Sequence, residues 1–336
     1  MRHLASIKKI DNILPIQNAD AIEKAIVGGW QIVIKKGEFK AGDLAVMSEI
    51  DSWIPTHLAP FLSKGKEPRE YKGIQGEKLR TIKLRGELSQ GLLLPLSILG
   101  DHSAEEGEDV SERLGIVKWE AEIPAQLSGI VRGLFPSFIH KTDQERIQNL
   151  PKQFNIWKDA NLSWEVTEKL DGSSMTVYHY GDNSGVCSRN LDLKKDEANS
   201  FWAVAIRENL IQKIISTGRN LALQGELIGA GIQKNPYGLT GQDFFLYDIW
   251  DIDSHSYLLP DERREICKQL EINHVPVISM QTKFSSDYTI SSVLLDAEGS
   301  SVLNNRTERE GLVFKSCETN QSFKAISNRF LLKGGE

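Results

Sequence analysis

A lysine followed after one residue by aspartate and glycine lies between two strand-like stretches, as Lys169-Leu170-Asp171-Gly172. A lysine amine can attack the α-phosphorus of a nucleoside triphosphate only when it is neutral, and the pKa of free lysine is about 10.4. Asp171 would raise that pKa further, so a catalytic lysine here also needs a cation nearby. Taken alone, the tetrapeptide more often forms a surface hairpin in which aspartate and glycine make the turn.

Five further short motifs follow this lysine and complete an ordered set of six. They supply an arginine, two glutamates, aromatic residues and two late lysines, in residues 188–190 (SRN), 224–227 (QGEL), 244–249 (FFLYDI), 310–315 (EGLVFK) and 323–325 (FKA). The set, in this order, resembles the motifs of the covalent nucleotidyltransferases, which include ATP- and NAD-dependent ligases and mRNA capping enzymes.

Residues outside the six motifs narrow the resemblance. A strand-rich N-terminal segment, then residues 135–138 (FPSF) and 141–149 (KTDQERIQN), then Glu168 before Lys169, look like the Deinococcus/Naegleria-type RNA ligase family over nearly the whole chain. Only 12 residues follow Lys324, which leaves no room for the C-terminal OB domain of DNA ligases and capping enzymes. We therefore expect an OB-like domain in front of the nucleotidyltransferase domain.

The resemblance implies an ATP-dependent RNA ligase that stores AMP on Lys169 through a phosphoramidate bond. The AMP would pass to a 5′-phosphate end, and an RNA 3′-hydroxyl would then displace it. The implied substrate is a nick in a duplex whose 3′-hydroxyl strand is RNA. Lys315 and Lys324 would add positive charge for the α-phosphate and the departing pyrophosphate.

Three carboxylates could supply the cation that the lysine needs. We expect Asp171, Glu226 and Glu310 to hold Mg²⁺ or Mn²⁺ mainly through water, because Mg²⁺ keeps much of its hydration shell when carboxylates bind it. The ion would lower the pKa of Lys169 and neutralise charge on the α-phosphate. Any one of these residues, taken singly, could instead be a surface carboxylate.

The resemblance also implies a nucleotide pocket. Phe245 and Tyr247 share one strand face by the period of two, so one of them could stack on adenine opposite Val313, or both could be core residues. Gly172 would permit a tight turn, and Arg189 would contact the AMP or the incoming 5′-phosphate, unless it is a surface arginine. The expected nucleotide-binding residues are Glu168, Gly172, Arg189, Phe245, Tyr247, Val313 and Lys315, with Arg146, Gln148 and Asn149 as further lining residues.

The sequence departs from some relatives at two positions. Where several of them have two lysines separated by one residue, this chain has Ser322 and Lys324, so Lys324 would act alone. Some RNA ligases have histidine where Asp171 stands. Both departures argue against those branches and leave ligation intact.

These residues need two kinds of scaffold. Strands are expected at 30–35, 44–50, 79–84 and 91–94, which favours a small OB-like barrel over residues 1–105, and residues 101–109 are typical of a linker. Residues 106–336 are expected to form an α+β domain with antiparallel sheets. Its expected strands are 164–168, 175–180, 244–250, 311–315 and 321–326, and its expected helices are 198–215, 261–270 and 289–296, with a helix-opening capping box at 142–145.

Composition limits the alternatives. The 336 residues carry a net charge of −6, but residues 64–85 hold eight lysines and arginines against three glutamates, which suits local contact with phosphates or simply a solvated face. The three cysteines form no CxxC pair, and no apolar run approaches the roughly 20 residues of a membrane helix. We expect a cytoplasmic or nuclear protein that binds nucleic acid and ATP, with no membrane contact and no obligate protein partner.

Three rival functions fit parts of the sequence. An mRNA guanylyltransferase would use GTP and carry a C-terminal OB domain. An NAD-dependent DNA ligase would carry a zinc finger, for which the three isolated cysteines are unsuited. A non-enzymatic OB-type RNA-binding protein would have lost the charged motif residues, whereas every one of them is present.

Overall fold

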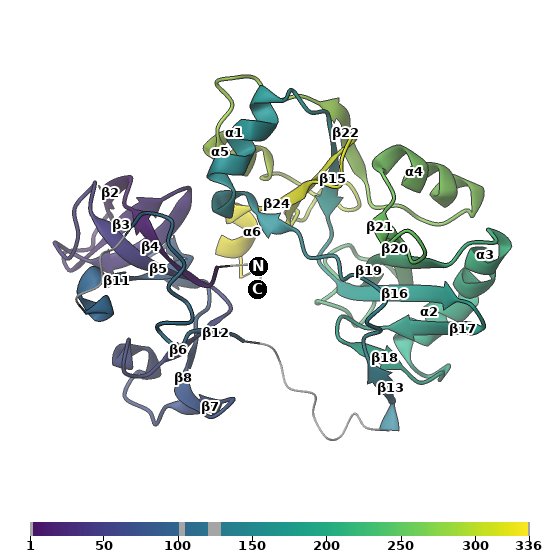
Figure 1. The fold of residues 1–336 in the computed structure, drawn as a ribbon, viewed down its shortest axis with the longest axis horizontal. Coiled ribbons are helices and arrows are strands. Elements are labelled where there is room, and N and C mark those ends of the chain that lie inside the picture. Colours follow the sequence, from purple (N-terminus) through teal and green to yellow (C-terminus); the bar gives the residue numbers. More distant parts are fainter. Residues whose placement is uncertain (1–2, 101–104, 120–128, 335–336) are drawn as a thin grey trace. The chain divides into compact units, whose positions relative to one another are not determined.

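The computed structural model describes residues 3–100, 105–119 and 129–334, and the chain forms two compact units. The smaller unit comprises residues 1–122 with 331–336, and the larger comprises residues 123–330. Each is described separately below, and both appear in Figure 1.

The smaller unit consists of short antiparallel strands. Three sheets of three or four strands have the orders β1-β5-β11, β2-β3-β4 and β12-β6-β8-β7, and β9 pairs with β10. The bounds are β1 Ala5–Lys9, β2 Asn12–Pro15, β3 Ile22–Val27, β4 Trp30–Lys35, β5 Leu44–Glu49, β6 Ser52–Pro55, β7 Arg69–Tyr71, β8 Ile74–Lys78, β9 Ile82–Leu84, β10 Glu87–Ser89, β11 Gly91–Pro95 and β12 Val117–Lys118, with 3₁₀ helices at Pro60–Ser63 and Leu96–Leu99.

Alternation of apolar side chains builds this barrel-like unit. In β4 the side chains of Trp30, Ile32 and Ile34 are buried, and they pack with residues of β3, β5 and β11 in one core. The Gln90 N–H donates to the Gln31 carbonyl at 2.7 Å, which joins the β4 edge to the segment before β11. The expected strand at 79–84 is shorter than predicted and forms only from Ile82.

The smaller unit continues beyond the predicted domain boundary between residues 105 and 106. Val110, Leu114 and Ile116 are buried in the same core as Ile7. The Ile7 N–H also donates to the Glu108 carbonyl at 2.9 Å. The expectation of a linker is therefore wrong for residues 107–109, while residues 101–104 lie outside the described residues. The linker prediction rests on the acidic residues and takes no account of the three apolar residues that follow them and need a core.

The larger unit has two antiparallel sheets and matches the expected α+β layout. One sheet has the order β13-β18-β17-β16-β19-β20-β21, and the other has the order β14-β24-β23-β15-β22, with β14 parallel to β24. The strands are β13 Val131–Leu134, β14 Glu145–Arg146, β15 Trp164–Lys169, β16 Ser173–Tyr180, β17 Asn183–Cys187, β18 Leu191–Leu193, β19 Leu221–Gly229, β20 Gln242–Asp251, β21 Ser256–Tyr257, β22 Val277–Thr282, β23 Gly311–Ser316 and β24 Ser322–Ile326.

Residues 274–276 connect the two sheets of the larger unit. The Val275 N–H donates to the Leu246 carbonyl of β20 at 3.0 Å, and the Glu168 N–H of β15 donates to the Pro276 carbonyl at 2.9 Å. The helices are α1 Pro151–Asp159, α2 Ser200–Arg207, α3 Leu210–Ser216, α4 Pro260–Gln269, α5 Ile290–Asp296 and α6 Asn328–Leu332, with a 3₁₀ helix at Ile147–Asn149. As Figure 1 shows, α1 and α5 lie beside the five-stranded sheet.

Two helix predictions are wrong in detail. Thr142 opens no helix, and its hydroxyl donates to Asp248 Oδ2 at 3.0 Å, while the chain enters β14 and a 3₁₀ turn before α1. The expected helix at 198–215 is two helices, α2 and α3, because Asn209 adopts a left-handed φ of 55°. Asparagine tolerates that conformation better than most residues, which explains the break.

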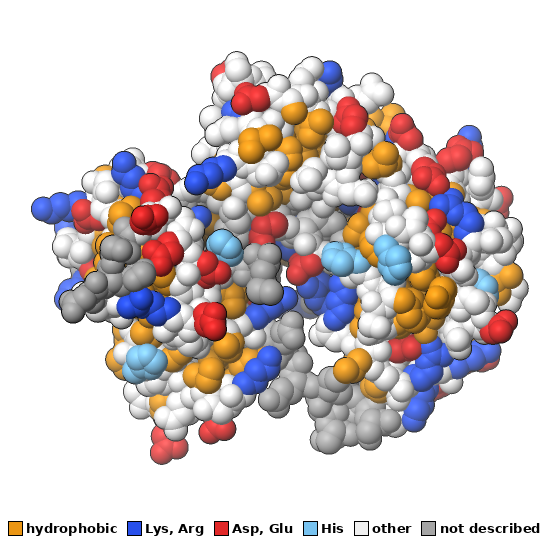
Figure 2. Space-filling view, in the orientation of Figure 1, with side chains coloured by type: hydrophobic (Ala, Val, Ile, Leu, Met, Phe, Trp, Pro, Cys, Tyr) orange, Lys and Arg blue, Asp and Glu red, His pale blue; other side chains and the backbone are white. Residues whose placement is uncertain are grey.

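The surface carries mixed charge. Figure 2 shows acidic and basic side chains interspersed on the face in view. Within the described residues, no helix combines the length and the apolar character that crossing a membrane would require.

Candidate nucleotide pocket

A pocket of about 230 Å³ lies between the two sheets of the larger unit. Lys169 ends β15, while Glu226 and Tyr247 reach the pocket from β19 and β20, and Val313 and Lys324 come from β23 and β24. The lining residues are Thr142, Asp143, Gln144, Thr167, Glu168, Lys169, Leu170, Gly172, Ser174, Arg189, Glu226, Tyr247, Val275, Val313, Lys315 and Lys324.

The Lys169 ammonium contacts a carboxylate directly. Lys169 lies opposite Gly311 in the β15–β23 ladder, so the preceding residue, Glu310, is within reach, and the Lys169 Nζ donates to Glu310 Oε1 at 2.6 Å. Burial lowers the pKa of Lys169, but Glu310, Glu226 and Asp171 outweigh that effect and raise the pKa above its ordinary value. As expected, the acidic neighbours favour the charged form of Lys169 over the neutral amine.

Two further carboxylates complete an acidic group around Lys169. Burial and then Glu310 raise the pKa of Asp171 to about 6, with Lys169 opposing. Burial raises the pKa of Glu226 to about 8; Lys169 opposes this shift, and Glu310 and Asp171 add to it. Three acids thus surround one lysine, and they repel one another when all are ionised. Glu226 lines the cavity, and Asp171 and Glu310 lie beside it near Lys169.

This donor set suits a hydrated divalent cation. In the part of the chain that the structure describes, no three histidine, cysteine, aspartate or glutamate side chains converge closely enough to hold an ion directly. Oxygen ligands that act through retained water are the arrangement that Mg²⁺ favours. The excess of acid around Lys169 and the contact geometry both fit the expected ion held through water by Asp171, Glu226 and Glu310.

Gly172 is required by a close approach of the backbone. A Cβ at this position would lie 2.5 Å from the Leu227 carbonyl oxygen and 2.7 Å from Ile228 Cγ2. The turn after Lys169 therefore packs directly on β19. The predicted tightness is present, and steric contact with β19 causes it.

The end of the pocket that is expected to hold the adenine, here called the base end, has one of the two expected aromatic rings. Tyr247 lines the pocket, and its hydroxyl lies 3.2 Å from Ser174 Oγ. Phe245 is absent from the lining and packs beside Tyr237 in a small core. Tyr247 packs against the same small core, so the two side chains share one strand face, as the period of two predicts.

Glu168 is nearly fully buried beside the pocket. Its Oε2 accepts the Val302 N–H at 2.7 Å. Burial raises the pKa of this carboxyl, although hydrogen bonds from Ser301 and Val302 oppose the shift. Its side chain therefore fixes the 301–303 segment, and Glu168 also lines the cavity.

The expected cations occupy two different places. Arg189 Nη2 and Lys324 Nζ each lie 3.6 Å from Asp143 Oδ1, so all three share one side of the pocket. Lys315 lies opposite Glu165 on β15, four residues before Lys169, which corresponds to about 13 Å along a strand. Lys315 lines the pocket and its Nζ donates to Asp248, so its expected contact with the α-phosphate stays a prediction.

Three further expected residues lie outside this lining, as Phe245, Asp171 and Glu310 do. Arg146 and Gln148 are buried, and the Asn149 Nδ2 donates to Glu145 Oε1 at 2.8 Å. Arg146 pairs with Lys324 in the β14–β24 ladder. The segment that contains them thus borders the strand of Lys324, and a nucleotide-binding role for them stays a prediction.

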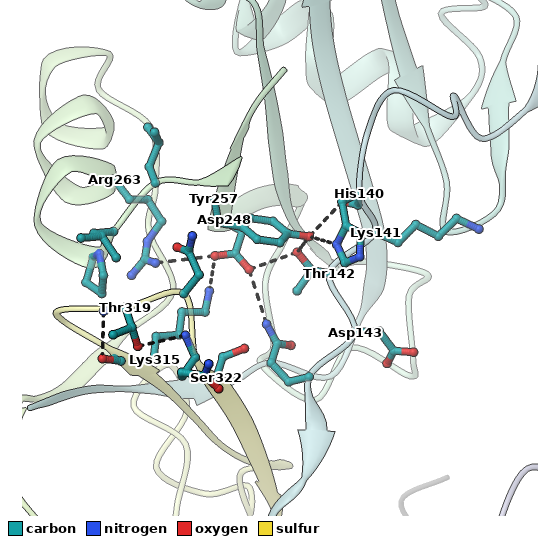
Figure 3. Close-up of a pocket in the computed structure, with 17 residues that line it drawn as sticks. His140, Lys141, Thr142, Asp143, Asp248, Tyr257, Arg263, Lys315, Thr319 and Ser322 are labelled. Atoms are coloured by element: carbon teal, nitrogen blue, oxygen red, sulfur yellow. Dashed lines mark hydrogen bonds and ion pairs between the residues drawn. The ribbon is translucent and has the colours of Figure 1, made fainter. Parts of the chain in front are cut away.

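A second cavity of about 170 Å³ adjoins the base end and shares Thr142, Asp143, Gln144 and Lys315 with the first. Figure 3 shows Asp248 at its centre, approached from several sides. The Asp248 Oδ1 accepts from Lys315 Nζ at 2.6 Å and lies 3.6 Å from Arg263 Nη1, while Oδ2 accepts from Thr142 and Gln144. Lys315 also donates to the Tyr247 carbonyl, and buried Arg263 pairs with Glu165.

Sequence reasoning missed several lining residues. Ser174 follows Gly172 at the strand period on β16, a signal that was available. Thr142, Asp143 and Gln144 lay inside a quoted motif, but the capping-box interpretation assigned them to a helix. Val275 enters through the irregular segment before β22, and no local pattern marks it.

Comparisons with known proteins agree with this geometry. The RNA ligase family model matches residues 162–330, and an OB-fold domain model matches residues 4–96. No curated protein matches the chain. Structures of a Naegleria gruberi RNA ligase are similar: a variant with AMP and Mn has 48% identity, 99% coverage of both chains and a TM-score of 0.84.

Two further structures of the Naegleria gruberi enzyme are equally similar. A variant with ATP and Mn has 48% identity, 98% coverage of both chains and a TM-score of 0.84. The enzyme with pyrophosphate has 48% identity, 99% coverage of both chains and a TM-score of 0.84. The predicted OB-like N-terminal domain and α+β second domain are thereby confirmed.

Proposed function

The chain belongs to the RNA ligase family and is an ATP-dependent RNA ligase, and we propose that it seals nicks in duplexes whose 3′-hydroxyl strand is RNA. The predicted family resemblance is confirmed by the family model and by 48% identity over nearly the whole chain. The observation that carries the chemistry is the Lys169 amine, 2.6 Å from Glu310 and surrounded by Asp171 and Glu226.

In the proposed first step, neutral Lys169 attacks the α-phosphorus of ATP. A bond forms between Nζ and phosphorus, the bond to the pyrophosphate oxygen breaks, and the amine loses a proton. A divalent cation held by Asp171, Glu226 and Glu310 would supply the positive charge that lowers the lysine pKa. The Naegleria gruberi ligase is solved with ATP and Mn, which supports ATP with Mn²⁺ or Mg²⁺ here.

The later steps transfer the stored AMP. A 5′-phosphate oxygen attacks the phosphorus on Lys169, the phosphorus–nitrogen bond breaks, and the amine regains its proton. The RNA 3′-hydroxyl then attacks the 5′-phosphorus, loses its proton and releases AMP. Arg189 and Lys324, which share Asp143, are placed to stabilise phosphate charge on one side of the pocket.

Tyr247 and Val313 are the proposed walls for the adenine. Tyr247 comes from β20 and Val313 from β23, so each sheet contributes one side of the pocket. Glu168 and Gly172 would shape its floor, and Lys315 the far end. Phe245, Arg146, Gln148 and Asn149 would then act by packing around the pocket.

The basic segment of the smaller unit is a proposed contact for the nucleic acid backbone. Its exposed cations are Lys64, Lys66, Arg69, Lys72, Arg80, Lys83 and Arg85. Arg69 pairs with Glu77, and Lys78 contacts Asp51 at 2.9 Å. Such cations bind phosphates without reading sequence, which suits an enzyme that acts on breaks.

The proposed location is the cytoplasm or the nucleus. Cys187, Cys267 and Cys317 are all free thiols, and the first two are buried. Burial raises the pKa of Cys187 and Cys267, so both are unreactive thiols of the core.

The substrate proposal is tested with a panel of ends that carry AMP already. Nicked duplexes with RNA or DNA 3′-hydroxyl strands and single-stranded RNA ends are given to Lys169→Ala without ATP, which isolates the last step. We expect the RNA nick to be sealed at least about tenfold faster than either alternative, since positioning by the duplex lowers the barrier. Equal or faster joining of single strands would refute the nick assignment.

A further inference from the structure

The loop between β19 and β20 has an unusual backbone. Gln233, Lys234 and Asn235 have φ values of 43°, 58° and 49°, so three successive residues with side chains are left-handed. Only glycine adopts this conformation without cost, and a run of such residues persists only where surrounding contacts fix it.

Side-chain hydrogen bonds fix this loop from within and from outside. The Asn235 side chain donates to the Leu239 carbonyl at 2.8 Å and accepts the Leu239 N–H at 3.1 Å. The Asn304 side chain donates to the Pro236 carbonyl at 2.8 Å. The segment before β23, which leads to Glu310, thus holds the loop as well.

The loop reaches the turn that follows Lys169 at two points. The Asp171 N–H donates to the Tyr237 hydroxyl at 2.5 Å, and the Gln233 Nε2 lies 3.4 Å from the Gly172 carbonyl. The Tyr237 ring is buried with Leu170 in a small core. Tyr237 itself lies outside the pocket lining, so its effect on the pocket passes through the Asp171 backbone.

We propose that Tyr237 is a positioning residue that orients Asp171 toward Lys169 and the divalent cation. The ring alone could serve the core, but the hydroxyl is the acceptor for a backbone N–H that lies within the turn. Without that acceptor the Asp171 peptide would turn toward another partner, because an unpaired buried N–H is costly. The left-handed run brings Tyr237 to this place. The proposal rests on the proposed role of Asp171.

The test measures ATP binding in a background without chemistry. Tyr237→Phe is made in Lys169→Ala, and ATP is titrated by calorimetry over a series of Mn²⁺ concentrations. Tyr257→Phe in the same background is the matched control, because the hydroxyl of this half-buried tyrosine also bonds to the backbone, donating to the His140 carbonyl at 2.9 Å, and Tyr257 lies outside the pocket lining. Melting temperatures of both variants report the loss of packing.

We expect Tyr237→Phe to raise the Mn²⁺ concentration for half-maximal ATP binding about tenfold, the effect of one buried hydrogen bond. Affinity for ATP at saturating Mn²⁺ should change by less than about twofold, and Tyr257→Phe should leave both values unchanged. An equal Mn²⁺ requirement in the two variants, whatever their melting temperatures, would overturn the positioning role.

A second variant covers failure to fold. Gln233→Ala removes the weaker contact to Gly172 and should raise the Mn²⁺ requirement about twofold to threefold. If Tyr237→Phe does not fold, an unchanged Mn²⁺ requirement in Gln233→Ala overturns the role. If the Lys169→Ala parent binds ATP independently of Mn²⁺, the carboxylate site itself is wrong, and the positioning role falls with it.

Discussion

Two adjoining cavities of the larger unit contain similar charged residues but differ in how those charges are balanced. The nucleotide pocket places Lys169 among Asp171, Glu226 and Glu310, three acids against one ammonium. The second cavity places one acid, Asp248, between Lys315 and Arg263, with hydroxyl and amide donors on its other oxygen. Around Lys169 the negative charges outnumber the positive one, whereas in the second cavity the charge of Asp248 is balanced by cations of the chain itself.

The pKa values follow from this difference. In the nucleotide pocket, burial and mutual repulsion raise the pKa of Glu226 to about 8, so its negative form is disfavoured without an external cation. In the second cavity, burial lowers the pKa of Lys315 to about 8; Asp248 opposes this shift and Arg263 adds to it. Buried charges that are paired within the chain have a structural role, whereas an unbalanced group of acids indicates a site for a bound cation.

The largest effect on activity is expected for Glu226→Gln. We expect the rate of Lys169 adenylylation to fall by about two to three orders of magnitude, the usual effect of removing one group that organises charge in the transition state. The measurement is single-turnover labelling with ATP and Mn²⁺. Loss of less than about threefold would remove Glu226 from the metal site.

The same variant should be more stable than the wild type. The folded protein holds a proton on Glu226 between the ordinary glutamate pKa and about 8, so this group lowers stability as pH rises through that range. At pH near 8.5, Glu226→Gln should melt at least about 3 °C higher in the absence of ligands. A lower melting temperature would contradict the account of an unmet excess of acid.

Asp248→Asn should have the opposite effect on stability. Neutralising Asp248 removes the carboxylate that Lys315 and Arg263 share, at a cost of about 3 kcal/mol in the free energy of unfolding. Urea denaturation measures it. Asp143→Asn is the control, because Asp143 is half-exposed with contacts of 3.6 Å and should cost less than about 1 kcal/mol. Equal losses would erase the distinction between the cavities.

The smallest predicted effect is on pH dependence. Asp171 and Glu226, with pKa values of about 6 and about 8, must lose protons before a cation can bind, so rising pH favours the metal. Between pH 6 and 8 the Mn²⁺ concentration for half-maximal adenylylation should fall by up to about tenfold per unit and then level off. A requirement that is the same at pH 6 and pH 8 would show that these acids do not compete with protons for the ion.

Much of the scaffold follows from local sequence patterns. Alternation in β4 and the apolar runs of β15, β20 and β23 identify strands because each must bury one or both faces. The motif order predicts that Lys169, Glu226 and Glu310 belong to one site. Strand register brings Lys169 and Glu310 together, because Lys169 at the end of β15 lies opposite Gly311 at the start of β23. Sequence spacing alone does not encode this register.

Features that depend on long-range contacts could not be predicted from the sequence. The left-handed Asn209 divides one amphipathic pattern into two helices. The contact between Lys315 and Asp248 depends on β20 meeting β23, so no local pattern predicts it. Such placements depend on tertiary contacts, which local periodicity does not contain.

Storage of AMP on Lys169 is tested most directly by labelling. Wild type and Lys169→Ala are incubated with α-labelled ATP and Mn²⁺ after removal of bound AMP, run on a denaturing gel, and mapped by peptide mass. We expect an acid-labile label on the Lys169 peptide of wild type and none on Lys169→Ala. No label on wild type, or a label that persists in Lys169→Ala, would contradict it.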